Sequence, residues 1–413
     1  MNVVCTIVAK NYFASAKVLG ESLKKTNPNV GFIILLADEI EKDDKFDFSN
    51  YSVIEAKDLG IVGFYEMAYK YDITEFCTSV KPFFIAYLFE KYNYDKIIYL
   101  DPDIYVFDSL IDIFNKLDFF SVVLTPHIIF NSGIETITQP DISVERGLLG
   151  SGVFNLGFVA FNSSFDSKQI LLWWKDRLIN NCYNDRNTYL YTDQKWMDLL
   201  PCLFDKICIL RDPRFNIAWW NFHEREICFD GINWKTNKQG EMCNIVFVHF
   251  SGYKPNCPES ITKADKSIIA NKMDVILILF DFYKQCLFSN NYITYMPYSY
   301  KYNSYSNGYI ITPLQRRLFR TLLEQDFKCE NPFLVDSVYY LKLLESNLII
   351  KNDVTKYNDT RINNEYKSKM IGFSKFIFIP LRFILGLKNY MNMIGFFENH
   401  VTKENQDFLF RHR

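Results

Sequence analysis

The chain has 413 residues, of which 49% are hydrophobic and 23% are charged, and this composition is ordinary for a soluble globular protein. The charges almost cancel, because 46 lysines and arginines face 48 aspartates and glutamates, which excludes a strongly basic nucleic-acid-binding protein and an acidic disordered chain. We find no uninterrupted apolar run of about 18 residues, the length that a membrane-spanning helix needs, and roughly 150 residues per domain predicts two to three domains.

The first 250 residues alternate short apolar runs with amphipathic stretches, and this rhythm predicts an α/β domain. The apolar runs are continuous rather than alternating, which favours a mostly parallel sheet covered on both faces. A loop is expected over 126–152, where glycine, serine and proline are frequent. The expected strands are 2–9, 31–37, 51–56, 95–100, 119–125, 154–161, 207–210 and 244–248, and the expected helices are 13–25, 74–92 (with Pro82 as a kink or start), 108–117, 167–180 and 192–200.

The character of the chain changes near residue 260 and becomes helical. We predict a domain over 1–260, a helical extension over 261–350, and a linker with a basic amphipathic tail over 351–413. Helical patterns cover 264–289, 312–325 and 336–350, with an irregular connector over 290–308 and a polar linker over 351–369.

The tail over 370–397 is apolar, and Lys375, Arg382 and Lys388 are spaced through it. Such a helix either lies in a membrane interface or docks on the core of its own protein. Pro380 argues against one straight helix.

The ten cysteines form no C-x-x-C pair, so a zinc site or a thioredoxin-like motif is not expected. Several lie inside apolar stretches, as Cys5 and Cys208 do, and we interpret them as reduced structural residues. The first residues show no basic region followed by a long apolar core, so no secretory signal is visible. These observations predict a cytoplasmic protein, with peripheral contact at the inner face of the membrane as an addition if the tail binds lipid.

Two carboxylates follow the apolar run 97–100, in the segment Asp101-Pro102-Asp103, and another apolar run comes directly after them. Ligands of α/β sheets bind at the carboxyl ends of the strands, and paired carboxylates at that edge form a hard-oxygen site that suits Mn²⁺ or Mg²⁺. Such a cation would neutralise a diphosphate. A capped turn without a metal is the alternative interpretation.

A third metal ligand is plausible at His249, which ends the apolar run 244–248. Gly252 follows and allows a close approach of the backbone, and Lys254 offers a charge for a phosphate. A histidine at such a place can also be purely structural. His127 and His223 are the rival candidates, and neither has a similar glycine and lysine after it.

The D-P-D segment between apolar strands resembles the D-x-D of GT-A-type, nucleotide-sugar-dependent glycosyltransferases, and further motifs resemble glycosyltransferase family 8 and its bacterial relatives. The resemblance covers about residues 2–258. Its motifs in chain order are Ala9-Lys10-Asn11-Tyr12 after the first strand, the D-P-D, Phe154-Asn155-Leu156-Gly157, Asp193-Gln194, and His249-Phe250-Ser251-Gly252.

The resemblance implies a retaining hexosyltransferase that takes a sugar from a nucleotide sugar, with a UDP-sugar as the first choice, and uses Mn²⁺ or Mg²⁺. It implies a GT-A-type, Rossmann-like sheet, and an acceptor that is a glycan, a glycolipid or a protein, as in the synthesis of surface glycans. The implied roles are metal binding by Asp101, Asp103 and His249, nucleotide binding by Ala9, Asn11, Tyr12, Lys81, Gly252 and Lys254, and contact with the donor sugar near its anomeric carbon by Asn155, Asp193 and Gln194.

Two departures from the family pattern bear on these roles. Lys10 stands where the family usually has an aspartate that contacts the base, which leaves the base open. Lys254 comes five residues after His249 instead of the usual six, which leaves its phosphate contact open.

Retention needs either a covalent intermediate on a carboxylate, for which Asp193 is the candidate, or attack from the same face guided by the leaving phosphate. We favour same-face attack, because glutamine is a poor nucleophile and a good hydrogen-bonding group. The aromatic segment 219–223 either contacts the acceptor or packs in the core.

Two other functions remain as alternatives. One is a metal-dependent nucleotidyltransferase or phosphohydrolase that uses the same carboxylates, and the other is a non-catalytic protein that binds a nucleotide sugar or carbohydrate.

Overall fold

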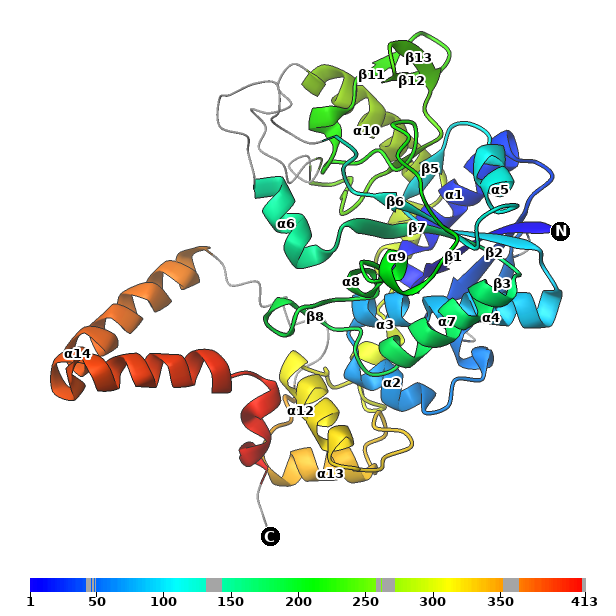
Figure 1. Cartoon of the computed structure of the whole chain (residues 1–413). Coiled ribbons are helices and arrows are strands. Elements are labelled where there is room, and N and C mark those ends of the chain that lie inside the picture. Colours follow the sequence, from blue (N-terminus) through cyan, green and yellow to red (C-terminus); the bar gives the residue numbers. More distant parts are fainter. Residues whose placement is uncertain are drawn as a thin grey trace. The chain divides into compact units, whose positions relative to one another are not determined.

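The computed structural model describes residues 1–41, 46, 48, 50–130, 143–257, 261, 272–351 and 364–410 (Figure 1). The chain divides into two compact units, one of residues 1–62 with 73–301 and one of residues 63–72 with 302–413. These limits differ from the domain boundaries near 260 and 350 that the sequence suggests, and those boundaries remain a prediction.

The first unit is built on a seven-stranded sheet in the order β10-β6-β7-β4-β1-β2-β3. Parallel pairing joins β4 to β1, β1 to β2, β2 to β3 and β6 to β10, whereas β7 runs antiparallel to both of its neighbours. The prediction of a mixed α/β fold with a mostly parallel sheet is therefore confirmed. The strands are β1 (Asn2–Val8), β2 (Gly31–Leu36), β3 (Ser52–Glu55), β4 (Lys96–Leu100), β6 (Val122–Pro126), β7 (Phe154–Asn162) and β10 (Ile207–Ile209).

Helices pack against this sheet because its central strands are apolar on both sides. Leu19 and Leu23 of α1 (Phe13–Thr26) join Ile98, Phe158 and other strand residues in one buried cluster. Elsewhere α4 (Lys81–Tyr92) lies beside α7 (Phe165–Leu178) (Figure 1). The core is thus layered above and below the sheet, and polar groups that follow the strands gather at its edge.

Apart from α10, which has 17 residues, the remaining elements of this unit are short. The helices are η1 (Lys10–Tyr12), η2 (Ala56–Leu59), α3 (Ile73–Ser79), α5 (Ile111–Lys116), α6 (Ser143–Ser151), η3 (Arg186–Thr188), α8 (Gln194–Met197), α9 (Leu200–Leu203), η4 (Phe222–Glu224), α10 (Met273–Ser289) and α11 (Tyr292–Tyr295). The smaller sheets pair β5 (Ile104–Val106) with β14 (Phe247–His249), β8 (Asn184–Asp185) with β9 (Leu190–Tyr191), and β11 (Ile227–Phe229) with β12 (Trp234–Lys238) and β13 (Glu241–Asn244).

Several local predictions need correction. The stretch 74–92 is two helices, because Pro82 lies in the first turn of α4 and begins a new helix there. The predicted loop 126–152 contains α6 at its end, while 131–142 lie outside the described residues. The sheet of β11, β12 and β13 was not predicted, since β12 and β13 are largely polar and β11 has only three residues. Of the predicted helix 264–289, residues 264–271 lie outside the described part.

The second unit packs α2 (Phe64–Lys70) with α12 (Pro313–Glu324), α13 (Val338–Glu345), and η9 (Glu404–Leu409). The short helix η7 (Lys301–Asn303) spans the limit between the units. Thr312 caps α12 through a capping box with Gln315. The buried Arg316 donates to the backbone carbonyls of Ala68, Tyr69 and Tyr71, so one side chain holds the end of α2 to α12.

The tail forms α14 (Asn364–His400), a helix that bends sharply (Figure 1). The bend lies at Gly386, whose φ of 71° is a left-handed conformation that favours glycine, and Pro380 lies inside the first arm. The predicted interruption therefore occurs six residues after the proline. Of the predicted linker, 352–363 lie outside the described residues. Within the described part of the chain, no helix combines the length and hydrophobicity that crossing a membrane requires.

Candidate active site

Asp101 and Asp103 lie in the turn that leads from β4 into β5. The Asp101 amide donates to the Gly157 carbonyl of β7 at 2.7 Å, and the Ile104 amide donates back to the Asp101 carbonyl at 3.1 Å. Strand β5 then pairs antiparallel with β14, with Ile104 opposite His249. The sheet therefore brings His249 beside two carboxylates that are far from it in the chain.

The three predicted metal ligands converge in the structure. His249 Nε2 lies 3.1 Å from Asp103 Oδ1 and 3.8 Å from Asp101 Oδ2, and one possible ligand atom from each of the three residues lies within 4.8 Å of the others. His249 is buried, whereas both carboxylates are partly exposed. Two carboxylate oxygens and an imidazole nitrogen suit Mn²⁺ or Mg²⁺, so the residues present fit the predicted cation.

The histidine and the carboxylates of this cluster stabilise one another's charged forms and thereby shift their pKa values. Burial alone would raise the pKa of Asp103, but His249 and backbone amides, including that of Gly252, hold it below its usual value. Burial lowers the pKa of His249, and the two carboxylates outweigh that effect and raise it. A cation bound here would take the place of the imidazolium proton as the partner of the carboxylates.

Asn155 orients His249 from behind. Asn155 Oδ1 lies 3.1 Å from His249 Nδ1 and accepts a hydrogen bond from Asn216 Nδ2 at 3.1 Å. Because an amide oxygen can only accept, this contact fixes one proton on Nδ1, so Nε2, which faces the carboxylates, is the nitrogen that would give up its proton to bind a cation. A Cβ added at Gly157 would lie 2.4 Å from His249 Cε1, so this position of the F-N-L-G segment has no room for a side chain.

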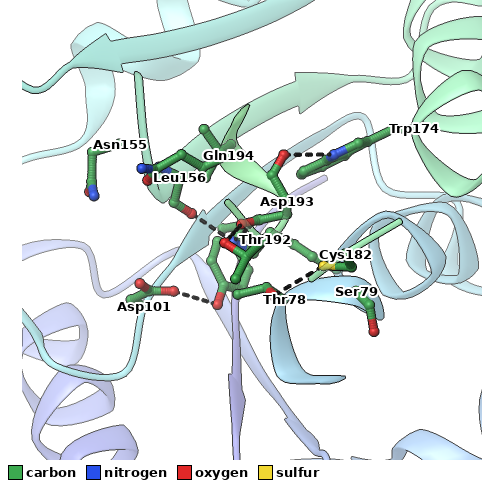
Figure 2. A network of polar contacts seen from close by, with 12 residues as sticks. Thr78, Ser79, Asp101, Asn155, Leu156, Trp174, Cys182, Thr192, Asp193 and Gln194 are labelled. Atoms are coloured by element: carbon green, nitrogen blue, oxygen red, sulfur yellow. Dashed lines mark hydrogen bonds and ion pairs between the residues drawn. The ribbon is translucent and has the colours of Figure 1, made fainter. Parts of the chain in front are cut away.

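The predicted residues Lys81 and Asp193 form a buried ion pair next to the cluster. Lys81 Nζ lies 2.6 Å from Asp193 Oδ2 and donates to the Leu156 carbonyl at 2.7 Å, and Figure 2 shows Asp101, Leu156 and Asp193 around this network. Asp193 also accepts from Thr192 Oγ1 at 3.2 Å. Burial raises the pKa of Asp193, and the Lys81 ammonium opposes that rise. Lys81 is thus committed to a carboxylate rather than open to solvent.

The amide of Gln194 is held at both ends. Its Nε2 donates to the Ser151 carbonyl at the end of α6 at 2.6 Å. Its Oε1 accepts from the Leu156 amide of β7 at 3.4 Å, and Figure 2 shows these two residues. Gln194 therefore joins α6 to the strand that carries Asn155. Of the two neighbours Asp193 and Gln194, only Asp193 carries a charge, and that charge is paired with Lys81.

The predicted nucleotide-binding residues lie at the end of β1, one strand away from β4. Ala9 precedes η1 and accepts from the Tyr12 amide at 3.0 Å. The Asn11 side-chain oxygen is buried without a hydrogen-bond partner among the described residues. Tyr12 is partly exposed, and partial desolvation of its phenol together with the charge of Asp103 raises the pKa of Tyr12 to about 12. Gly252 follows β14 with a φ of 73°, and Lys254 lies exposed beyond it.

The rival histidines are not part of the cluster. His127 is buried, and burial lowers its pKa to about 4, so it is neutral. Its Nε2 lies 3.5 Å from Asn155 Nδ2, and its ring contacts Trp220, which in turn packs edge-on against His249. His223 lies in η4. The only group of three or more metal-ligating side chains among the described residues is that of Asp101, Asp103 and His249.

Sequence reasoning missed Asp38, Tyr99 and Asn216. Asp38 follows β2 at the same edge of the sheet and accepts from the Lys10 amide at 3.4 Å. Tyr99 donates to Asp101 Oδ1 at 2.6 Å. A carboxylate directly after an apolar run was the signal for Asp101, and the same signal could have found Asp38. The tyrosine and asparagine carried no such signal.

The sequence was also compared with protein-family models and with known proteins. The model of glycosyl transferase family 8 matches residues 3–255. The uncharacterized protein YfnF of Bacillus subtilis (strain 168) is 26% identical over 255 residues, which are 60% of this chain and 81% of that protein.

Two solved structures are also similar. The galactosyltransferase LgtC, in complex with donor and acceptor sugar analogues, is 18% identical with a TM-score of 0.39, over 65% of this chain and 94% of that one. The glycosyltransferase GlyE of Streptococcus pneumoniae TIGR4 is 15% identical with a TM-score of 0.39, over 84% of each chain. The family match spans more than half of the chain, and this protein is a glycosyltransferase that belongs to glycosyl transferase family 8.

Proposed function

We propose that this enzyme transfers a sugar from a nucleotide sugar, with a UDP-sugar as the expected donor, and that it depends on Mn²⁺ or Mg²⁺. The observation that carries the proposal is the convergence of Asp101, Asp103 and His249 beside the Lys81–Asp193 pair. These three side chains would hold the cation. When bound, it would stabilise the negative charge of the leaving nucleoside diphosphate.

The other residues divide between the two halves of the donor. Ala9, Asn11 and Tyr12 would line the nucleotide pocket, where the buried oxygen of Asn11 needs a donor such as a base or ribose group. Gly252 and Lys254 would approach the phosphates. Asn155, Asp193 and Gln194 would border the sugar, with the Lys81 charge supporting Asp193.

The pairing of Asp193 with Lys81 favours same-face attack and retention of configuration. A carboxylate bound by an ammonium at 2.6 Å is a weaker nucleophile than a free one. In the proposed step, the bond from the anomeric carbon to the diphosphate oxygen breaks and a bond to the acceptor oxygen forms on the same face. The diphosphate oxygen accepts the proton of the acceptor hydroxyl, so charge and atoms balance without a covalent enzyme intermediate.

A donor screen tests the function. Purified enzyme is incubated with UDP-glucose, UDP-galactose, UDP-N-acetylglucosamine and GDP-mannose, each with Mn²⁺ or with EDTA, and the released nucleoside diphosphate is measured. We expect metal-dependent hydrolysis of one donor, and its loss in the Asp101→Ala and Asp103→Ala variants.

The matched control is Asp166→Ala, an aspartate whose ion pair with Lys206 lies away from the site. Equal turnover in Asp101→Ala and Asp166→Ala would contradict the proposed metal site. Calorimetric titration with UDP and Mn²⁺ covers the case of a strict requirement for the acceptor, because binding does not need one.

The stereochemistry has its own test once the donor is known. The anomeric configuration of the first product is measured by proton NMR, and we expect it to match that of the donor. Mass spectrometry of the enzyme during turnover should show no sugar on Asp193. A trapped glycosyl-Asp193 adduct would replace same-face attack by a covalent mechanism.

We also propose that α14 contacts the inner face of a membrane, which would place the enzyme in glycolipid or surface-glycan synthesis. Apolar side chains are exposed along both arms of the helix, as at Phe376 (79%), Phe383 (73%), Ile384 (78%) and Leu387 (67%). The segment 370–397 carries basic residues and no acidic ones, so its charge suits anionic lipid.

Vesicle sedimentation tests this contact with the full chain. We expect binding to phosphatidylcholine vesicles that contain phosphatidylglycerol, weaker binding to phosphatidylcholine alone, and loss of binding in the Phe376→Asp, Phe383→Asp double variant. Phe119→Asp is the matched control, because that phenylalanine is 78% exposed in the first unit. Binding that the double variant retains would contradict the role of α14.

A further inference from the structure

Tyr99 lies between the candidate metal site and the buried ion pair. It is the fourth residue of β4, opposite Val159 of β7 and Cys5 of β1, so its backbone lies in the middle of the sheet. Side chains two residues apart along a strand share a face, which puts the side chains of Tyr99 and Asp101 on the same side. Tyr99 is 3% exposed and has no freedom to turn away.

The hydroxyl of Tyr99 is hydrogen-bonded to one carboxylate oxygen of Asp101, a predicted metal ligand. It donates to Asp101 Oδ1 at 2.6 Å, whereas Asp101 Oδ2 faces His249 Nε2 at 3.8 Å. The two oxygens of this carboxylate therefore have different partners. The hydrogen bond fixes the rotation of the carboxylate and leaves the other oxygen turned toward the cluster.

The ring of Tyr99 covers the buried cation. Lys81 Nζ lies 4.4 Å from the centre of the ring, while it contacts Asp193 Oδ2 and the Leu156 carbonyl. An ammonium has three donors, and two of them are used by these oxygens. The aromatic face stabilises the charge without competing for those donors.

We propose that Tyr99 is a positioning residue that joins the two parts of the active site, by orienting Asp101 with its hydroxyl and Lys81 with its ring. The inference rests on the proposed function, because it assigns Asp101 to the metal and Lys81 to the support of Asp193. One rigid side chain thus sets the distance between the place where the diphosphate leaves and the carboxylate beside the sugar.

Two substitutions separate the two contacts. Tyr99→Phe keeps the ring and removes the hydroxyl, so it should weaken the binding of Mn²⁺ in the presence of UDP by about 10-fold, as the loss of a partner of a metal ligand typically does. At saturating Mn²⁺ its turnover should return most of the way to that of the wild type. Tyr99→Leu also removes the ring, and its turnover should stay low at saturating Mn²⁺.

Tyr339→Phe is the matched control. Tyr339 is equally buried, lies in the second unit, and donates to the Gln315 carbonyl over the same 2.6 Å. The control should lose thermal stability to a similar degree as Tyr99→Phe and should leave the Mn²⁺ affinity unchanged. A difference in affinity between the two variants is therefore not explained by the loss of a buried hydroxyl.

Isothermal titration of each variant with Mn²⁺ in the presence of UDP gives the affinity without measuring catalysis. Wild-type affinity in Tyr99→Phe, together with lost binding in Asp101→Ala, overturns the role of Tyr99 and leaves the proposed function standing. Failure of the wild type itself to bind Mn²⁺ with UDP overturns the proposed function and this inference with it. A weakening shared by Tyr339→Phe also overturns the inference.

Discussion

Lys81 and Arg316 are two buried cations whose partners differ in kind. Lys81 is 1% exposed and pairs with the Asp193 carboxylate, whereas Arg316 is 4% exposed and donates to neutral oxygens. The partners of Arg316 are the carbonyls of Ala68, Tyr69, Tyr71 and Tyr302 and the side-chain oxygen of Asn303, at 2.6–3.4 Å.

The kind of partner determines what a buried cation does in the fold. A cation that binds backbone carbonyls fixes the path of the chain, and here it fixes the end of α2. A cation that binds a side-chain carboxylate fixes the direction and ionisation of that carboxylate, and Asp193 lies where the proposed chemistry takes place. We therefore expect losses at Lys81 to appear in turnover and losses at Arg316 to appear in stability.

The largest effect is expected for Lys81→Met, which leaves a buried carboxylate without its cation. The free energy of unfolding should fall by about 3–5 kcal/mol. Donor turnover should fall by about 100-fold or more, the usual loss when one preorganised charge is removed from a site. Urea denaturation and initial rates measure the two effects.

The double variant Lys81→Met, Asp193→Asn is the control for this pair. It has no uncompensated charge, so part of the stability should return while turnover stays low. If the single variant Lys81→Met kept its turnover, Lys81 would be a structural cation, as Arg316 is.

Arg316→Met should have the next largest effect, confined to stability. Removal of the guanidinium leaves several buried carbonyls without a donor, which should cost about 3 kcal/mol. Metal affinity and donor KM, measured at a temperature where the variant remains folded, should be those of the wild type. A folded Arg316→Met protein with impaired Mn²⁺ binding would break the comparison.

Asp38 extends the comparison to an anion, because its carboxylate accepts from the backbone amides of Lys10, Glu39 and Lys301 at 3.0–3.4 Å. Burial raises the pKa of Asp38 to about 6, against 3.8 in an unfolded chain. Between these values the folded protein keeps a proton that the unfolded chain has lost, so this group contributes less stability as the pH rises through that range.

The Asp38→Asn variant lacks this titration. Relative to the wild type, its free energy of unfolding should therefore rise by about 2 kcal/mol from roughly pH 4.5 to roughly pH 7.5. Urea denaturation at several pH values measures the slope of this difference. A difference that does not change with pH would mean that the Asp38 pKa is not raised.

The smallest effect is expected for Thr312→Ala, which removes the capping box at the start of α12. The cost should be about 1 kcal/mol, since the first turn loses one side-chain acceptor. Thermal unfolding checks the loss, and donor turnover at low temperature should be unchanged. A loss as large as that of Arg316→Met would mean that the cap, rather than the cation, organises this part of the second unit.

Much of the first unit was predictable because its strands are continuous apolar runs. The runs ending at Val8, Leu36 and Leu100 each read as a buried strand, and the polar residues after them fall at one edge of a parallel sheet. The convergence of Asp101, Asp103 and His249 followed from the same rule plus the motif order. What the sequence could not show was pairing between distant side chains, such as Lys81 with Asp193 or Tyr99 with the Lys81 charge.

The failures share a physical cause. The strands β11, β12 and β13 are held by their ladders of backbone hydrogen bonds, which leave no mark on the hydrophobic pattern. In α14 the bend is at Gly386 rather than Pro380, because a proline within a helix costs hydrogen bonds but a left-handed φ ends the helical path. Sequence patterns therefore locate what is buried better than they locate where the backbone turns.

The pairing of β5 with β14 has a consequence for how this enzyme responds to its substrates. The proposed metal ligands Asp103 and His249 come from distant parts of the chain and meet only when these two strands are paired. Anything that binds across them binds the folded chain and not the unfolded one, and it shifts the folding equilibrium by mass action. Donor and cation would then act as folding ligands, and the midpoint of thermal unfolding would rise with their concentration even before an acceptor is known.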